Sequence, residues 1–185
     1  MPKNALRAAA VLVLVAAVAA PVAVAAPAPE APPAAPEATR TVSLKGAARL
    51  GYEVRTEQVR VTVDAHATYG PGSLPTGAGG TFRLSHVIDG KDYWGDFEVD
   101  CLTTGGPTAT VTGRLVRTSP GHPWNEAFDP HTRMGLSFYV PGNSANGKPR
   151  VGLAAPAPKG QPLLTPCMAP AADMPVVEGG YALRS

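Results

Sequence analysis

The sequence predicts an all-β protein, an antiparallel meander that closes into a small β-barrel or folds into a two-layer sandwich. Three observations support this prediction. Apolar and polar residues alternate in several segments between Val59 and Val140. Short turn signals separate these segments. The 20 glycines and 21 prolines among 185 residues disfavour long helices and require frequent turns.

The first strand is predicted over residues 59–68, where every second residue is apolar. Its apolar face consists of Val59, Val61, Val63, Ala65 and Ala67. A stretch rich in glycine, proline and serine at 70–80 is expected to end this strand, and residues 81–88 are expected to form the next. The following Asp89-Gly90 predicts a two-residue hairpin turn, because such turns require positive φ angles.

Three further strands are predicted at residues 93–102, 108–116 and 134–140. In the first of them the inner face is expected to carry Tyr93, Phe97, Val99 and Cys101. Its outer face is expected to carry Trp94, Asp96, Glu98 and Asp100. Residues 151–153 and 176–183 are the remaining strand candidates, whereas residues 119–131 are too long and too rich in proline for a hairpin.

Residues 1–25 have the features of a signal peptide for the general secretory pathway. Lys3 and Arg7 precede an uncharged run over 8–20, and Ala23 and Ala25 supply the small residues of a cleavage site. The alternative, a membrane anchor, requires a run of about 20 apolar residues. The sequence therefore predicts a secreted protein that begins near Ala26 and has no membrane span after cleavage.

Two regions follow the cleavage site. Residues 26–38 are expected to form a disordered linker, because five of the twelve residues from Pro27 to Ala38 are proline. Residues 39–185 have the length of one β domain. Without Lys3 and Arg7, the 16 basic residues fall to 14 and equal the 14 acidic ones. A neutral domain is a poor partner for nucleic acid or for an anionic membrane.

The two cysteines, Cys101 and Cys167, are expected to form a disulfide, because an exported chain matures in an oxidising compartment. The alternatives are a free reactive thiol and a metal thiolate. No histidine or further cysteine stands at ligand spacing from either residue. A bridge would fasten the irregular segment 156–175 to the sheet.

Four short motifs resemble a group of small exported proteins of Actinobacteria, some of which carry the automatic name repetin. The motifs are Val99-Asp100-Cys101-Leu102, Val111-Thr112-Gly113, Pro166-Cys167 and Gly179-Gly180-Tyr181. The similarity covers about residues 59–184. It implies an exported all-β fold and no particular activity, because the group has no assigned function. The loop at 119–133 is longer here than in that pattern.

One loop gathers residues of the types that bind metal ions, namely His122, Glu126, Asp129 and His131. Imidazole and carboxylate groups are ligands for zinc and related ions. The spacing matches no recognised metal motif, and loops collect polar residues for other reasons. In the alternative interpretation, Trp124 and Phe128 simply pack this loop onto the sheet.

The outward row formed by Trp94, Asp96 and Glu98 is a second candidate site, for a polysaccharide or a protein. It also fits an ordinary solvated sheet face. His86 is expected on the apolar side of its strand, where a hydrogen-bonded core histidine is commoner than a catalyst. The sequence contains no Gly-x-Ser-x-Gly nucleophile motif and no phosphate-binding glycine loop, and it indicates no cofactor.

The sequence favours a secreted, monomeric β-domain without catalytic activity that binds an unknown extracellular ligand or protein, or that is structural. A second hypothesis is a barrel that carries a small apolar ligand. This hypothesis predicts a cavity lined by Tyr93, Phe97, Phe82 and Phe138. Two further hypotheses, a metal-dependent hydrolase and a protease inhibitor, both place the activity in the loop at 119–133.

Overall fold

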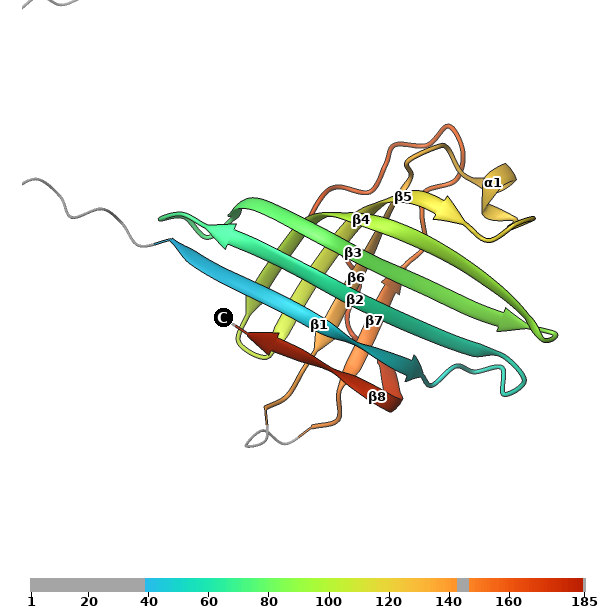
Figure 1. The fold of residues 1–185 in the computed structure, drawn as a ribbon, viewed down its shortest axis with the longest axis horizontal. Coiled ribbons are helices and arrows are strands. Elements are labelled where there is room, and N and C mark those ends of the chain that lie inside the picture. The colour runs from blue at the N-terminus through green and yellow to red at the C-terminus, as the bar shows by residue number, and fades with distance from the viewer. Residues whose placement is uncertain (1–38, 143–146, 185) are drawn as a thin grey trace, which may run out of the picture. The chain divides into compact units, whose positions relative to one another are not determined.

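The computed structural model describes residues 39–142 and 147–184, and their eight strands form one antiparallel sheet that closes into a barrel (Figure 1). Each strand pairs with the next along the chain, and the last pairs with the first. The strands are β1 (Arg40–Leu50), β2 (Gln58–Tyr69), β3 (Pro75–Ile88), β4 (Lys91–Gly105), β5 (Thr108–Thr118), β6 (Arg133–Tyr139), β7 (Arg150–Ala154) and β8 (Met174–Arg184). The one helix among the described residues is the short α1 (Trp124–Ala127). The predicted all-β fold is confirmed, as a barrel rather than a sandwich.

The predicted signal peptide and linker, residues 1–25 and 26–38, lie outside the described residues. In the parts of the chain that the structure covers, no helix is long and apolar enough to cross a membrane.

The alternation of β2 places its apolar residues in the barrel interior, where they are at most 3% exposed. Aromatic rings complete this interior. The rings of Phe82 and Phe97 stack with their centroids 4.5 Å apart, and Phe138 meets Tyr181 edge to face at 4.8 Å. Close packing of this kind is the main stabilising contribution in a small barrel.

Two tyrosines bring hydroxyl groups into this apolar interior, and each donates to a backbone carbonyl. Tyr69 donates to the carbonyl of Leu102 at 3.0 Å, and Tyr181 donates to that of Val61 at 3.1 Å. Burial raises the pKa of the Tyr181 hydroxyl, which therefore stays protonated and keeps its role as a donor. Both hydrogen bonds join strands that are not neighbours in the sheet.

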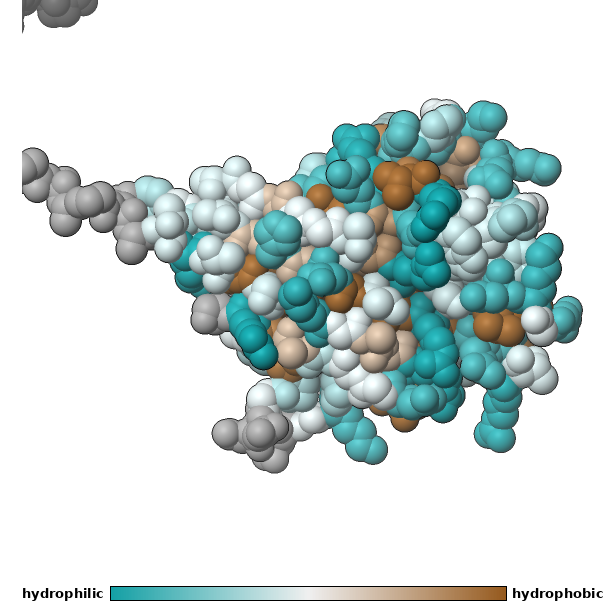
Figure 2. Space-filling view, in the orientation of Figure 1, coloured by the Kyte–Doolittle hydropathy of each residue, from teal (hydrophilic) through white to brown (hydrophobic). Residues whose placement is uncertain are grey.

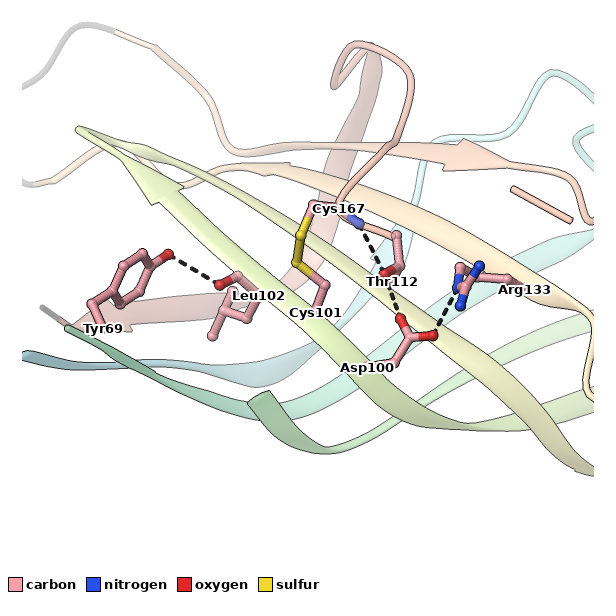
Figure 3. The surroundings of a disulfide bond; sticks show 7 residues. All are labelled: Tyr69, Asp100, Cys101, Leu102, Thr112, Arg133 and Cys167. Carbon is pink, nitrogen blue, oxygen red and sulfur yellow. Dashed lines mark hydrogen bonds and ion pairs between the residues drawn. A yellow bond between two sulfur atoms is a disulfide. The ribbon is translucent and has the colours of Figure 1, made fainter. Parts of the chain in front are cut away.

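The prediction that Cys101 lies on the inner face of the sheet is wrong, because β4 contains a bulge at Asp100. Val99 pairs with Gly113, yet Cys101 pairs with Thr112, so one residue of β4 has no partner. An extra residue in one strand reverses the alternation beyond it. Leu102, which is fully buried, takes the inner position. Cys101 instead bonds to Cys167 (Figure 3).

Two strand predictions need correction. The sequence analysis predicted no strand at the position of β1, and β3 begins at Pro75 rather than at residue 81. Residues 77–80 continue the ladder with β2, where Ala78 lies opposite Ala67. The segment of β1 does alternate, because Val42, Leu44, Ala48 and Leu50 are buried at every second position around Gly46, and this pattern was overlooked. Residues 77–80 show no apolar alternation, because three of them are glycine, and their pairing with β2 places them in the sheet.

Other predicted elements are confirmed. The turn between β3 and β4 contains Asp89 with a φ of 50° and Gly90 with a φ of 77°, as a two-residue hairpin requires. The strands predicted at 108–116, 134–140, 151–153 and 176–183 are present as β5 to β8, with small differences at their ends. The disulfide between Cys101 and Cys167 is also present, with 5.3 Å between the Cα atoms.

Residues 155–173, which we call the strap, join β7 to β8 without strand structure and lie against the outside of the barrel. Gly135 and Gly152 leave the room for this contact. A Cβ atom on either would collide with a backbone oxygen of the strap, that of Met168 or Ala171. The disulfide fixes the strap to β4.

The bulge at Asp100 supplies the polar contacts that hold the strap (Figure 3). One oxygen of the Asp100 carboxylate accepts from the Thr112 hydroxyl at 2.6 Å, and the other accepts from Arg133 Nε at 2.7 Å. The Thr112 oxygen in turn accepts from the Cys167 backbone N–H at 3.2 Å, and Arg133 donates to the carbonyl of Leu164. Asp100 thus positions Thr112 and Arg133, the two side chains that form hydrogen bonds with the backbone of the strap.

We expect the loss of the disulfide to loosen the strap and to leave the barrel folded. The bridge spans 66 residues, for which the chain-entropy model gives about 4 kcal/mol of stabilisation. In the double variant Cys101→Ala/Cys167→Ala, urea unfolding should show a loss of that order. Amide hydrogen exchange should accelerate mainly in residues 155–173. Equal acceleration in β1 and β2 would contradict this expectation.

Candidate ligand site at one end of the barrel

One end of the barrel is covered by the loop at 119–132, which contains α1. The loop at 51–57 and the turn at 89–90 lie at the same end, because antiparallel strands place alternate connections together. Figure 1 shows α1 beside the end of β5, close to where β5 leaves the sheet. We call this end the α1 end.

Trp124, the first residue of α1, closes the barrel at the α1 end by filling a place that β4 leaves free. A Cβ atom on Gly95 would lie 2.7 Å from Cζ3 of the indole, so only glycine admits the ring in this position. The indole meets Phe97 edge to face at 6.0 Å and lies 5.8 Å from the ring of Phe128. The interpretation of Trp124 as an anchor of its loop is therefore confirmed.

A pocket of about 290 Å³ lies between the Trp124 loop and the inner face of β3 and β4. Its lining consists of Leu84, His86, Ile88, Tyr93, His122, Pro123 and Trp124. We call it the mouth pocket. Its lining is mainly apolar and aromatic, with two imidazoles as the most polar groups, which is the usual composition of a small-molecule site.

His122 is 7% exposed and is fixed by its own loop. Its Nδ1 atom accepts a hydrogen bond from the backbone N–H of Trp124 at 3.1 Å. Its ring lies between those of Trp124, at 4.4 Å, and Tyr93, at 5.6 Å. Burial lowers the pKa of His122, so the ring is neutral at pH 7. A neutral ring that accepts at Nδ1 carries its proton on Nε2.

His86 lines the other side of the mouth pocket and is bonded to a carboxylate. Its Nε2 atom lies 2.6 Å from Oε2 of Glu57, and the ring of Tyr52 meets it edge to face at 5.1 Å. This agrees with the expectation of a hydrogen-bonded histidine on the inner face. Sequence reasoning did not identify Glu57, because this residue lies in a loop where no pattern marks it.

The structure does not assemble the four metal candidates of the loop into one site. His122 faces the mouth pocket, whereas Glu126 and His131 are exposed. Asp129 accepts a hydrogen bond from the backbone N–H of Gly160 in the strap, at 2.7 Å. Within residues 39–142 and 147–184, no three His, Cys, Asp or Glu side chains are grouped so as to hold a metal ion.

The outward row is brought together only in part. Asp96 accepts two hydrogen bonds from Arg83, at 2.6 and 2.9 Å, and two from Arg117, at 2.7 and 3.2 Å. The hydrogen bond from Arg83 is the main cause of a lowered pKa at Asp96. The guanidinium groups of Arg83 and Arg117 lie 4.3 and 5.3 Å from the ring of Trp94. Glu98 is exposed and lies opposite Thr81, so it extends the row along the strand.

The cavity expected between Tyr93, Phe97, Phe82 and Phe138 has a different composition in the structure. Phe97 and Phe138 are fully buried and pack against other rings. Tyr93 lines the mouth pocket, where histidines and Trp124 replace the other three rings. The sequence could not indicate this lining, because Trp124 and His122 come from a loop far along the chain from β3.

The outer surface offers separate apolar residues rather than one broad apolar area. Figure 2 shows hydrophobic residues on one face as small patches among hydrophilic ones. The exposed large apolar residues are Tyr52, Val54, Leu74, Val116, Leu163, Met168 and Val177. Scattered residues of this kind are ordinary on protein surfaces and do not mark a docking site.

Comparisons of this chain with protein-family models, with curated proteins and with solved structures find no match. The function is therefore inferred from the chemistry of the mouth pocket.

We expect Gly95→Ala to displace Trp124, because the added methyl group would overlap the indole and approach Phe97 within 3.2 Å. Overpacking of this kind typically costs about 1–3 kcal/mol. In a Trp94→Phe background, Trp124 fluorescence should shift to longer wavelength as the indole meets water. Gly77→Ala is the matched control, because nothing lies within 4 Å of its Cβ position. An unchanged spectrum for Gly95→Ala would show that Trp124 does not pack against Gly95.

We expect the burial of neutral His122 to make the fold less stable below about pH 6.5. The pKa of His122 is lower in the folded protein than in the unfolded chain, so the unfolded state takes up a proton first as the pH falls. This loss is limited to about 1.4 kcal/mol per pH unit. His122→Asn keeps a hydrogen-bond acceptor and cannot titrate, so it should flatten the profile between pH 7 and pH 5.

Urea unfolding at several pH values measures this effect. The control is His66→Asn, since His66 is exposed on β2. An equal flattening in the control would show that His122 is not the responsible group.

Proposed function

We propose that this protein is an exported, non-catalytic β-barrel that binds a small, largely apolar ligand in the mouth pocket. The observation that supports this proposal is the pocket itself, an apolar space of about 290 Å³ beside the indole of Trp124. An apolar protein cavity of about 150 Å³ can hold benzene. The mouth pocket is therefore of a size for a compound with one or two rings.

The composition of the lining supports binding rather than catalysis. Among the described residues that line the pocket, none is Ser, Thr or Cys, and the one side-chain hydroxyl is the phenol of Tyr93. The two histidines orient a bound ligand, while Leu84, Ile88 and Trp124 supply the apolar contact area. This division of roles is usual in binding sites.

Export is supported by two independent features. The run of uncharged residues at 8–20 follows two basic residues and precedes a small-residue cleavage pattern, so we propose that the mature chain begins near Ala26. The disulfide between Cys101 and Cys167 is of a kind that persists in oxidising compartments. The resemblance to small exported proteins of Actinobacteria agrees with this assignment, and we propose a monomer that works outside the cell.

We expect uncharged aromatic compounds to bind at the α1 end with saturable effects. Toluene and p-cresol are suitable probes, and the NMR signal of the Trp124 indole N–H reports on the pocket directly. Ile88→Trp should abolish saturation, because the larger side chain fills the pocket. The control is Leu74→Trp, which adds the same ring at a residue 68% exposed in the turn before β3.

The proposal fails if no probe produces saturable shifts at Trp124. It also fails if Ile88→Trp, folded as judged by circular dichroism, binds the probes as tightly as the control does.

A further inference from the structure

Each histidine of the mouth pocket uses one ring nitrogen to bond to the protein. His122 uses Nδ1, which accepts from the Trp124 backbone, and His86 uses Nε2, which bonds to Glu57. Among the described residues, no group forms a hydrogen bond to His122 Nε2 or to His86 Nδ1. Two polar ring atoms of the lining are thus left to a ligand or to water.

Neither ring atom is fully enclosed. In the described part of the chain, the buried side-chain nitrogen and oxygen atoms without a hydrogen-bond partner are Thr132 Oγ1 and Ser137 Oγ. His122 Nε2 and His86 Nδ1 are not among them, so both atoms retain some accessible surface. Both rings belong to the lining of the mouth pocket.

The two free nitrogens have opposite hydrogen-bonding roles when both rings are neutral. His122 accepts at Nδ1, so its proton is on Nε2 and this atom donates. The Glu57 carboxylate can only accept a hydrogen bond, so a neutral His86 donates to it from Nε2–H. The Nδ1 atom of His86 then carries a lone pair and can accept a hydrogen bond. The two histidines therefore present one donor and one acceptor in a pocket whose other lining is mainly apolar and aromatic.

Building on the proposed function, we propose that the mouth pocket selects phenols, that is, uncharged aromatic rings that carry one hydroxyl group. A hydroxyl is the simplest uncharged group that both accepts and donates a hydrogen bond. Its oxygen accepts from His122 Nε2, its hydrogen is donated to His86 Nδ1, and the ring lies against Trp124, Tyr93 and Ile88. An ether or a carbonyl satisfies only His122, and a hydrocarbon satisfies neither histidine.

The charges around the pocket disfavour an anion. Glu57 places a carboxylate directly behind His86, and His122 is neutral at pH 7. The ammonium group of Lys91 lies over the ring of Tyr93, 4.6 Å from the centroid. Lys91 is not part of the lining, so a carboxylate inside the pocket would lose its hydration without direct compensation.

The test compares four probes of similar size at pH 8, where His122 is neutral because burial lowers its pKa. The probes are p-cresol, 4-methylanisole, toluene and 4-methylbenzoate, and binding is measured on the full mature protein by the shift of the Trp124 indole signal. We expect p-cresol to bind about tenfold more tightly than 4-methylanisole and toluene, a difference of about 1.4 kcal/mol. We expect 4-methylbenzoate to bind more weakly than toluene.

Variants test which groups select the hydroxyl. His122→Phe and His86→Phe remove one hydrogen bond each and keep an aromatic ring in the lining. In either variant the affinity ratio of p-cresol to toluene should fall towards one, while toluene still binds. His66→Phe, at an exposed residue of β2, is the control and should leave the ratio unchanged.

The outcomes separate this inference from the function on which it rests. If toluene, 4-methylanisole and p-cresol bind equally well, the pocket is a ligand site and the selection of phenols is wrong. Tighter binding of 4-methylbenzoate than of p-cresol also overturns the selection, in favour of an anion held by Lys91. If none of the probes binds, the proposed function itself is wrong. The comparison of probes on the unaltered protein remains decisive even if a variant fails to fold.

Discussion

The pairing of β1 with β8 is the constraint on which the rest of the described structure depends. It joins the two ends of the meander, from Ser43 opposite Arg184 to Leu50 opposite Val176. The ring is completed by a much shorter contact between β7 and β8, in which Arg150 lies opposite Pro175 and Val151 opposite Met174. The pairing of β1 with β8 therefore contributes most of the contact that brings the C-terminal strand into the sheet.

The α1 end shows how the candidate ligand site is formed. The missing side chain at Gly95 leaves room for the indole of Trp124, which packs against the core at this end. The mouth pocket beside it is bounded by Ile88 and Tyr93 on the sheet and by His122 in the loop at 119–132. The loop supplies a donor and the sheet supplies an acceptor, so a ligand would contact both. Binding at this place should also strengthen the attachment of the loop to the barrel.

A single inserted residue, Asp100, organises the attachment of the strap to the outside of the barrel. The bulge at Asp100 turns Cys101 away from the interior and places the Asp100 carboxylate beside Thr112 and Arg133. These two residues bind strap backbone at Cys167 and Leu164. The strap has no strand of its own, so its position depends on this group, on the disulfide and on the hydrogen bonds of Lys159 and Gly160 to the loop at 119–132. One bulge thus serves both the covalent and the polar attachment.

Local patterns were sufficient to predict the strands with a clear period of two, such as β2, and the turn at Asp89-Gly90, because alternation and turn chemistry are local properties. The disulfide was also predictable, since two cysteines allow one intramolecular pairing. His86 was placed correctly on the inner face, but its partner Glu57 could not be found. Long-range contacts were needed to close the sheet and to draw the glycine-rich start of β3 into it, whereas the alternation of β1 is itself local and was overlooked. They were also needed to bring Trp124 to Gly95 and to turn Cys101 outward at the bulge. Each of these features depends on residues far apart in the chain, and a local pattern carries no information about such partners.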